Sequence, residues 1–74
     1  MIKVKCYSGY KADERPLSFT INERVFFVEE IIDQWHGEDY TYFKLRATDE
    51  CIYVLRHDER KDLWEITYFL NLLE

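Results

Sequence analysis

The sequence has few of the residues that favour turns or form disulfide cross-links. It has two glycines and one proline, and these three residues (Gly9, Pro16 and Gly37) lie in its first half. It has two cysteines, too few for a small fold held together by disulfides. No apolar run approaches the ~20 residues of a membrane-spanning helix, and the first residues show no apolar segment of signal-peptide length. We therefore expect a cytoplasmic protein with reduced thiols and no membrane partner.

Positive charge is also scarce, because 10 bases stand against 15 acids and the net charge is −5. Nucleic-acid-binding domains draw much of their affinity from Lys and Arg side chains that neutralise phosphates. The composition therefore argues against bulk nucleic-acid affinity but is compatible with a local basic stripe. Aromatic residues are abundant, with five Phe, six Tyr and two Trp. Each buries roughly 150–250 Å² in a core, so we expect residues 1–74 to fold as one small domain.

Apolar and polar residues alternate along most of the chain, which is typical of half-buried β-strands. The alternating or apolar segments are residues 2–8, 17–21, 24–35, 40–47, 51–56 and 63–69. Turn-forming or polar residues separate them, and Asn22-Glu23 in particular indicates a tight turn. The sequence predicts an all-β fold: a small curled antiparallel meander, or SH3-like barrel, of five to six strands.

Two segments leave alternatives open. Residues 24–35 have apolar residues on both strand faces and also fit one helical stripe, but Phe26 and Phe27 in series favour a strand. The pair Glu29-Glu30 indicates a bulge or bend where this strand changes side. The tail after residue 69 is compatible with a longer strand or with one helical turn.

The alternation assigns side chains to a core. The residues that we expect to be largely buried are Val4, Phe19, Phe43, Val54 and Ile66. The side chains expected to share a face are Leu17, Phe19 and Ile21 in one segment, and Trp64, Ile66 and Tyr68, opposite Phe69, in the last one. Cys6 and Cys51 fit small buried hydrophobic positions.

Residues 56–62, RHDERKD, form the most chemically suggestive stretch. A catalytic base also needs a pocket, a nucleophile or a bound metal. No HxH, HxxxH or CxxC spacing accompanies His57 or the other histidine, His36. Charged residues are readily solvated in loops. We therefore interpret the stretch as the solvated loop of a hairpin, and we predict no catalytic residue, no metal and no cofactor.

A candidate binding face lies on a single segment, where alternate residues project from one side: Tyr40, Tyr42, Lys44 and Arg46. Protein surfaces that bind single-stranded nucleic acid combine aromatic side chains, on which nucleobases stack, with Lys and Arg side chains. Alternatively, these side chains cover the solvent face of a thin barrel, with the aliphatic stems of the bases lying on the rings. A protein-binding surface is the third interpretation.

Four spaced motifs resemble a family of small uncharacterised bacterial proteins: SGYKADERP, DQWHGEDYTYFKLRA, YVLRHDE and LWEITYF. The resemblance covers residues 7–69. Its most specific elements are Glu14-Arg15-Pro16, Trp35, Tyr42-Phe43, Leu55-Arg56-His57-Asp58 and Trp64. The tryptophan and tyrosine-phenylalanine pattern is distantly similar to the C-terminal segment of some bacterial mutagenesis proteins that are similar to Y-family DNA polymerases. This resemblance implies a location in the bacterial cytoplasm and an accessory or partner-binding role in DNA repair.

Loop residues complete the set of candidate contacts. The polar segment 9–16 carries Tyr10 and Arg15, and loops between barrel strands often carry recognition, although internal ion pairing of this loop is equally compatible. The family pattern adds weight to Arg15 and to Arg56, His57 and Asp58.

The sequence as a whole predicts a non-enzymatic cytoplasmic interaction module that binds a protein partner. The alternative is a nucleic-acid or DNA-repair accessory module that uses the Tyr/Lys/Arg face. The distribution of charge separates them: bases gathered on one face would favour nucleic acid, whereas interspersed signs would favour protein.

Overall fold

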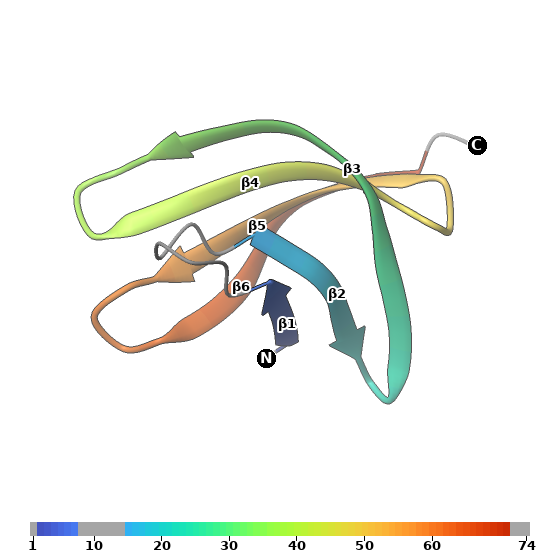
Figure 1. Ribbon diagram of the computed structural model, residues 1–74, viewed down its shortest axis with the longest axis horizontal. Coiled ribbons are helices and arrows are strands. Elements are labelled where there is room, and N and C mark those ends of the chain that lie inside the picture. Colours follow the sequence, from blue (N-terminus) through green and yellow to red (C-terminus); the bar gives the residue numbers. More distant parts are fainter. Residues whose placement is uncertain (1, 8–14, 72–74) are drawn as a thin grey trace.

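A computed structural model describes residues 2–7 and 15–71, which form one antiparallel sheet (Figure 1). Its six strands follow the chain in order: β1 (Lys3–Tyr7), β2 (Arg15–Ile21), β3 (Arg24–His36), β4 (Tyr40–Ala47), β5 (Cys51–Asp58) and β6 (Leu63–Asn71). The described ranges contain no helix, and the tail continues as strand to Asn71. The predicted all-β curled meander is confirmed.

The longest strand, β3, bends and is shared by two parts of the sheet. Its residues 24–27 pair with β2, whereas residues 28–36 pair with β4. Glu29 and Ile32 are extra residues that β4 does not match. Such bulges bend a strand and increase its twist, and Figure 1 shows β3 curving over the sheet. The predicted bulge at Glu29-Glu30 is confirmed.

Three of the tight turns use residues other than glycine for positive φ. Asn22 and Glu23 join β2 to β3 with φ of 47° and 70°, as the mirror-image turns of hairpins require. Glu50, between β4 and β5, and Asp62, between β5 and β6, also adopt positive φ, at 66° and 53°. Asparagine and aspartate tolerate this conformation better than most residues, which helps to explain why the chain manages with so few glycines.

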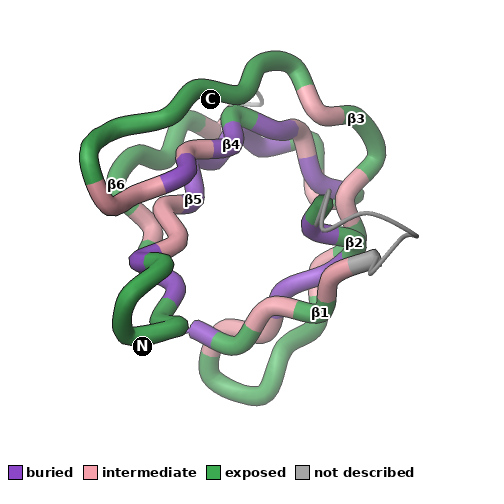
Figure 2. Tube along the Cα trace, turned by 60° about the vertical axis from the view of Figure 1, so that its left-hand side comes forward, coloured by how far each residue is buried: buried purple, intermediate pink, exposed green. Residues whose placement is uncertain are grey.

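The core occupies the inner face of the curled sheet. Its buried residues are Ile2, Phe19, Phe43, Leu45, Ala47, Cys51, Tyr53, Leu55 and Trp64. Figure 2 shows the buried segments bordering the inside of the ring, with most of the exposed segments at its periphery. The ring of Phe19 meets that of Tyr53 edge-on, with centroids 4.8 Å apart. This aromatic packing compensates for the small size of the domain.

Tyr53 shows how a polar group is accommodated in this core. Its hydroxyl donates a hydrogen bond of 2.5 Å to Asp49 Oδ2, and Asp49 Oδ1 accepts one from the Cys51 amide. Burial raises the pKa of Tyr53 well above its usual value, and the bond to Asp49 raises it further. The phenol therefore stays neutral, which avoids a buried charge.

The predicted core is confirmed in part. Phe19 and Phe43 are buried in it, whereas Val4 and Ile66 are half-buried and pack against it. Val54 is buried but does not belong to the inner cluster, because it alternates with the inward-facing Tyr53 and Leu55. Of the two cysteines, Cys51 lies in the core and Cys6 packs against it.

One bulge interrupts the predicted alternation at the start of β2, whereas Phe19 and Ile21 lie on the predicted inner side. Lys5 pairs with Ser18 but Cys6 pairs with Pro16, so Leu17 has no partner in β1. Leu17 is therefore 47% exposed, whereas Pro16 is fully buried. The prediction that Leu17 shares the inner face with Phe19 is wrong, because an extra residue reverses the alternation.

A second bulge does the same to β6. Val54 pairs with Tyr68 and Leu55 with Ile66, so Thr67 is the extra residue. Beyond it Phe69 turns inward, with its ring 5.1 Å from that of Tyr53, and Tyr68 turns outward. The prediction that Tyr68 continues the face of Trp64 is wrong for this reason.

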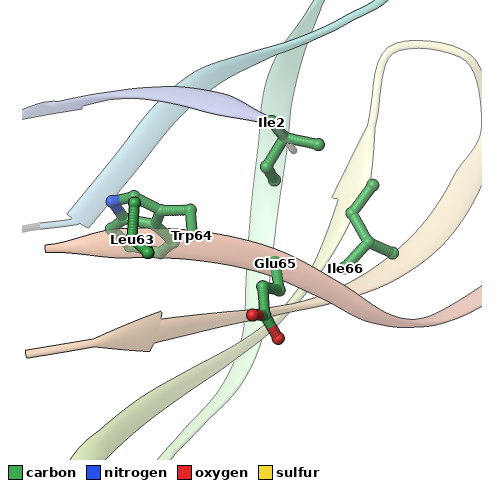
Figure 3. A pocket seen from close by; sticks show the side chains of 5 residues that line it. All are labelled: Ile2, Leu63, Trp64, Glu65 and Ile66. Atoms are coloured by element: carbon green, nitrogen blue, oxygen red, sulfur yellow. The ribbon is translucent and has the colours of Figure 1, made fainter. Parts of the chain in front are cut away.

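The ends of the sheet meet at one point. Ile2 and Trp64 form an isolated antiparallel bridge, and no ladder joins β1 to β6 in the described ranges. A pocket of about 540 Å³ lies at this junction, lined by Ile2, Leu63, Trp64, Glu65 and Ile66 (Figure 3). In Figure 3 the Glu65 carboxylate points away from Ile2. The sheet is therefore a half-barrel that closes only near its first residues.

Candidate functional site

The four residues of the predicted binding face share the outer side of β4. Tyr40, Tyr42, Lys44 and Arg46 alternate with buried residues along that strand, as predicted. Trp35 of β3 and Arg56 of β5 lie on either side of Tyr42 in the sheet. We call these six residues the outer face: Trp35, Tyr40, Tyr42, Lys44, Arg46 and Arg56.

Stacked aromatic rings form the centre of the outer face. The rings of Trp35 and Tyr42 are nearly parallel, at 6°, with centroids 5.3 Å apart. Tyr40 lies 6.2 Å from Tyr42, and the guanidinium carbon of Arg56 lies 4.5 Å from the centre of the Tyr40 ring. A Cβ atom at Gly37 would come within 3.2 Å of the Tyr42 ring, so glycine leaves room for it. The stack remains accessible, since Trp35 is 40% exposed.

Acidic side chains lie beside the bases of the outer face. Arg46 contacts Glu29 and Glu30 of β3, with N···O distances of 3.4 Å each. Arg56 forms an ion pair with Glu65 of β6, and its hydrogen bond to that carboxylate raises the pKa of the guanidinium. Exposed pairs of this kind contribute less than ~1 kcal/mol each to stability, so their main effect is on the local charge pattern.

Lys44 is the exception among these bases. It is exposed, it forms no ion pair with a described residue, and its neighbour in β3 is Asp33. The outer face thus presents stacked rings surrounded by charges of both signs.

Of the other predicted contacts, Arg56 is part of the outer face and the remaining described ones lie elsewhere. Arg15 lies in a shallow groove with Pro16, Leu17 and the β3 bulge that carries Glu29 and Glu30. It therefore stands near the acids that pair with Arg46 but is not part of the aromatic stack. Tyr10 lies outside the described residues.

The hairpin between β5 and β6 is present, but its loop is shorter than predicted. Arg56, His57 and Asp58 are strand residues, and the loop comprises residues 59–62. His57 stacks on Trp64, with ring centroids 4.3 Å apart, and its Nε2 lies 2.8 Å from Asp62 Oδ1. The prediction of a solvated loop is wrong for these three residues, because pairing with β6 carries the strand further.

Asp58 organises the turn that follows. Its carboxylate is buried, and Oδ1 accepts hydrogen bonds from the amides of Arg60 and Lys61, at 3.0 and 3.2 Å. Burial raises the pKa of Asp58, but the two amides and the charges of Arg60 and Lys61 outweigh it, so the pKa lies below its usual value. The charged carboxylate therefore stabilises the folded state.

We expect Asp58→Asn to lower the melting temperature at pH 7 by about 5 °C, because the amide bonds lose their charge assistance. A lowered pKa contributes stability that is fully present above the ordinary value of 3.8 and is lost as the pH falls through the folded-state pKa. Melting curves from pH 7 to pH 2 should therefore show the variant and parent converging. Glu38→Gln, at an exposed loop residue, is the matched control. A pH-independent difference would contradict this role for the charge.

A chain of polar contacts joins two hairpins at one end of the sheet. The Thr41 hydroxyl lies 3.2 Å from His36 Nδ1 and donates a 2.5 Å hydrogen bond to Glu59. The Glu59 amide donates to the Asp39 carbonyl, and Arg60 lies 3.5 Å from the Asp39 carboxylate. Figure 1 shows the β3–β4 and β5–β6 turns at this end. These contacts position the turns next to the aromatic stack.

Within residues 2–7 and 15–71, no group of three or more His, Cys, Asp or Glu side chains is arranged to hold a metal ion. Over the same ranges no helix has the length and apolar character required to cross a membrane.

No protein-family model, curated protein or solved structure matches the chain. The resemblance to small bacterial proteins and to mutagenesis proteins therefore stays a prediction.

Proposed function

We propose that this protein is a non-enzymatic interaction module of the bacterial cytoplasm that binds a protein partner through its outer face. The observation that carries the proposal is the exposed stack of Trp35 on Tyr42, bordered by charges of both signs. Tryptophan, tyrosine and arginine dominate the energetic centres of protein interfaces. Here all three are held on adjacent strands, so a partner meets a preorganised surface.

The charge distribution supports a protein partner over nucleic acid. Two of the three bases on the outer face, Arg46 and Arg56, form ion pairs with acids of neighbouring strands, and the cross-strand neighbour of the third, Lys44, is Asp33. Phosphates approaching these bases would also approach the carboxylates, whereas a protein surface can present complementary charges of both signs.

Nucleic-acid binding in DNA repair is the second candidate. One observation favours it: exposed Lys44 and Tyr42 are next-nearest neighbours on β4, and Tyr42 stacks on Trp35. An aromatic ring beside a base that forms no ion pair with a described residue is a small platform for a single strand of nucleic acid. With one such base in a chain of net charge −5, we expect weak, strongly salt-dependent binding.

We expect Tyr42→Ala to weaken binding of the protein partner by about 30-fold, the loss typical of a central interface residue. The partner is first captured from a native bacterial lysate and identified, and its Kd is then measured by calorimetry. Nuclease treatment should leave the capture unchanged. Val25→Ala is the control, because Val25 is 54% exposed in the part of β3 that pairs with β2.

Two results would count against the protein-binding proposal. One is an unchanged Kd in Tyr42→Ala. The other is salt-sensitive, submicromolar binding of a single-stranded oligonucleotide that is abolished by Lys44→Glu, which would favour the second candidate instead.

A further inference from the structure

The two edge strands of the sheet differ in how they are protected. β1 carries Lys3 and Lys5, which are exposed. β6 carries no charge from Ile66 to Leu70. Natural edge strands usually bear charges, lysine above all, that prevent pairing with another chain. The edge formed by Ile66–Leu70 lacks this protection, and we call it the β6 edge.

The β6 edge is apolar on both sides of the sheet. The bulge at Thr67 turns Tyr68 outward and Phe69 inward, and these side chains are 50% and 52% exposed. Leu70, two residues after Tyr68, is 43% exposed. Three consecutive large apolar side chains at one sheet edge are costly to leave in water.

The half-barrel leaves this edge accessible. β1 meets β6 only at the bridge between Ile2 and Trp64, so no strand in the described ranges pairs with the far side of Ile66–Leu70. Figure 1 shows β6 continuing away from β1 towards the opposite end of the molecule. Its outward-directed backbone groups can therefore form a ladder with an added strand.

We propose that the β6 edge pairs with the β6 edge of a second copy of this chain, in an antiparallel, two-fold-symmetric dimer. Each edge then supplies the hydrogen-bonding groups and apolar side chains that the other needs, as an isologous interface requires. The two sheets become one continuous sheet across the two-fold axis. This dimer goes beyond the proposed function, because it uses the sheet edge and leaves Trp35 and Tyr42 exposed.

Charge favours the antiparallel direction for this pairing. Two copies of net charge −5 repel each other at long range, and the acid within β6 is Glu65, the residue before the edge. Antiparallel pairing about the middle of the edge puts the two Glu65 residues at opposite ends of the ladder, roughly 20 Å apart, beyond the ~8 Å screening length of physiological salt. Parallel pairing would bring them together. The uncharged β6 edge can therefore pair with the β6 edge of a second copy in the antiparallel direction.

The same geometry limits the assembly to two copies. Once the two β6 edges are paired, each copy still has two unpaired edges in the described ranges. One is β1, with Lys3 and Lys5, and the other is the part of β3 from Val28 onward, which β2 does not reach and which carries Glu29, Glu30 and Asp33. These charges discourage further pairing, so we expect a closed dimer instead of a fibre.

The test is sedimentation velocity of the full chain over micromolar concentrations. We expect a monomer–dimer equilibrium that Tyr68→Lys weakens by about 100-fold, since two lysines then face each other near the two-fold axis. Tyr68→Glu should act likewise, and an equimolar mixture of the two variants should restore the dimer. Phe27→Lys is the control, because Phe27 is similarly exposed, at 58%, but lies in the part of β3 that pairs with β2.

Amide hydrogen exchange adds a second measurement. The amides of Ile66–Leu70 that point away from β5 should become protected as the concentration rises, whereas those at Lys3 and Lys5 should not change. A wild-type chain that stays monomeric throughout, or a dimer that survives Tyr68→Lys, would overturn the proposal. A dimer lost only in Phe27→Lys would overturn it as well, by placing the contact on another surface.

Discussion

Replacing Phe43 with Ala should lower the free energy of unfolding by about 3–5 kcal/mol. Phe43 is 2% exposed at the centre of β4, and its ring lies 5.8 Å from that of Trp64. Removing it leaves a cavity between strands that cannot collapse without bending the sheet. A domain of this length has a total stability of about 4–11 kcal/mol, so the substitution should remove a large fraction of it.

The measurement is urea unfolding followed by far-UV circular dichroism, with Tyr42→Ala as the control. Tyr42 is the preceding residue in β4 and points to the outer face, so its truncation should cost only the aromatic pairing, about 0.5–1.5 kcal/mol. The comparison therefore tests which face of the strand is inside. Equal losses for the two variants would contradict the strand register.

Alternation predicted the sheet well wherever the strands pair without interruption. In β4 every residue falls on the predicted face, because no bulge interrupts its pairing with β5. In β2 the prediction fails at Leu17, although Phe19 and Ile21 beyond it lie on the predicted face, and in β6 it fails after Thr67. Leu17 and Thr67 are each an extra residue in the ladder. A bulge is set by the partner strand and by the curvature of the whole sheet, and neither is visible in a local pattern.

The candidate site was predictable in composition but not in its contacts. The sequence indicates that Tyr40, Tyr42, Lys44 and Arg46 share a face, because that follows from period two alone. Alternation alone does not indicate that Trp35 stacks on Tyr42, since the cross-strand register depends on the length of the connection between β3 and β4. The signal that could have found the pair is the short connection through Gly37, which makes nearby residues on either side of it cross-strand neighbours.

Charged stretches are a second limit of prediction from sequence. The acids and bases of residues 56–62 are typical of a solvated loop, yet Asp58 is buried and caps the turn. A short carboxylate side chain can accept hydrogen bonds from two backbone amides of a turn or from water. An aspartate in a charged stretch therefore has the same sequence pattern whether it caps a turn or is solvated.

The second large effect is expected from Trp64→Ala, which should cost about 3–5 kcal/mol and open the half-barrel. Trp64 is 8% exposed and contacts two rings, those of Phe43 and His57, on neighbouring strands. It also forms the one bridge between β6 and Ile2 in the described ranges. Its removal should therefore weaken the core and release β1 from the far end of the sheet.

Trp35→Ala is the matched control, because Trp35 is the other tryptophan and is 40% exposed on the outer face. We expect it to cost about 0.5–1.5 kcal/mol, the contribution of one aromatic pair. Native-state hydrogen exchange should show faster exchange at Lys3 and Val4 in Trp64→Ala but not in Trp35→Ala, since β1 depends on Trp64 for its contact with β6. If the amides of β1 stayed protected in Trp64→Ala while the melting temperature fell, Trp64 would support the core without closing the sheet. If neither quantity changed, the junction at Ile2 would not hold the two ends of the sheet together.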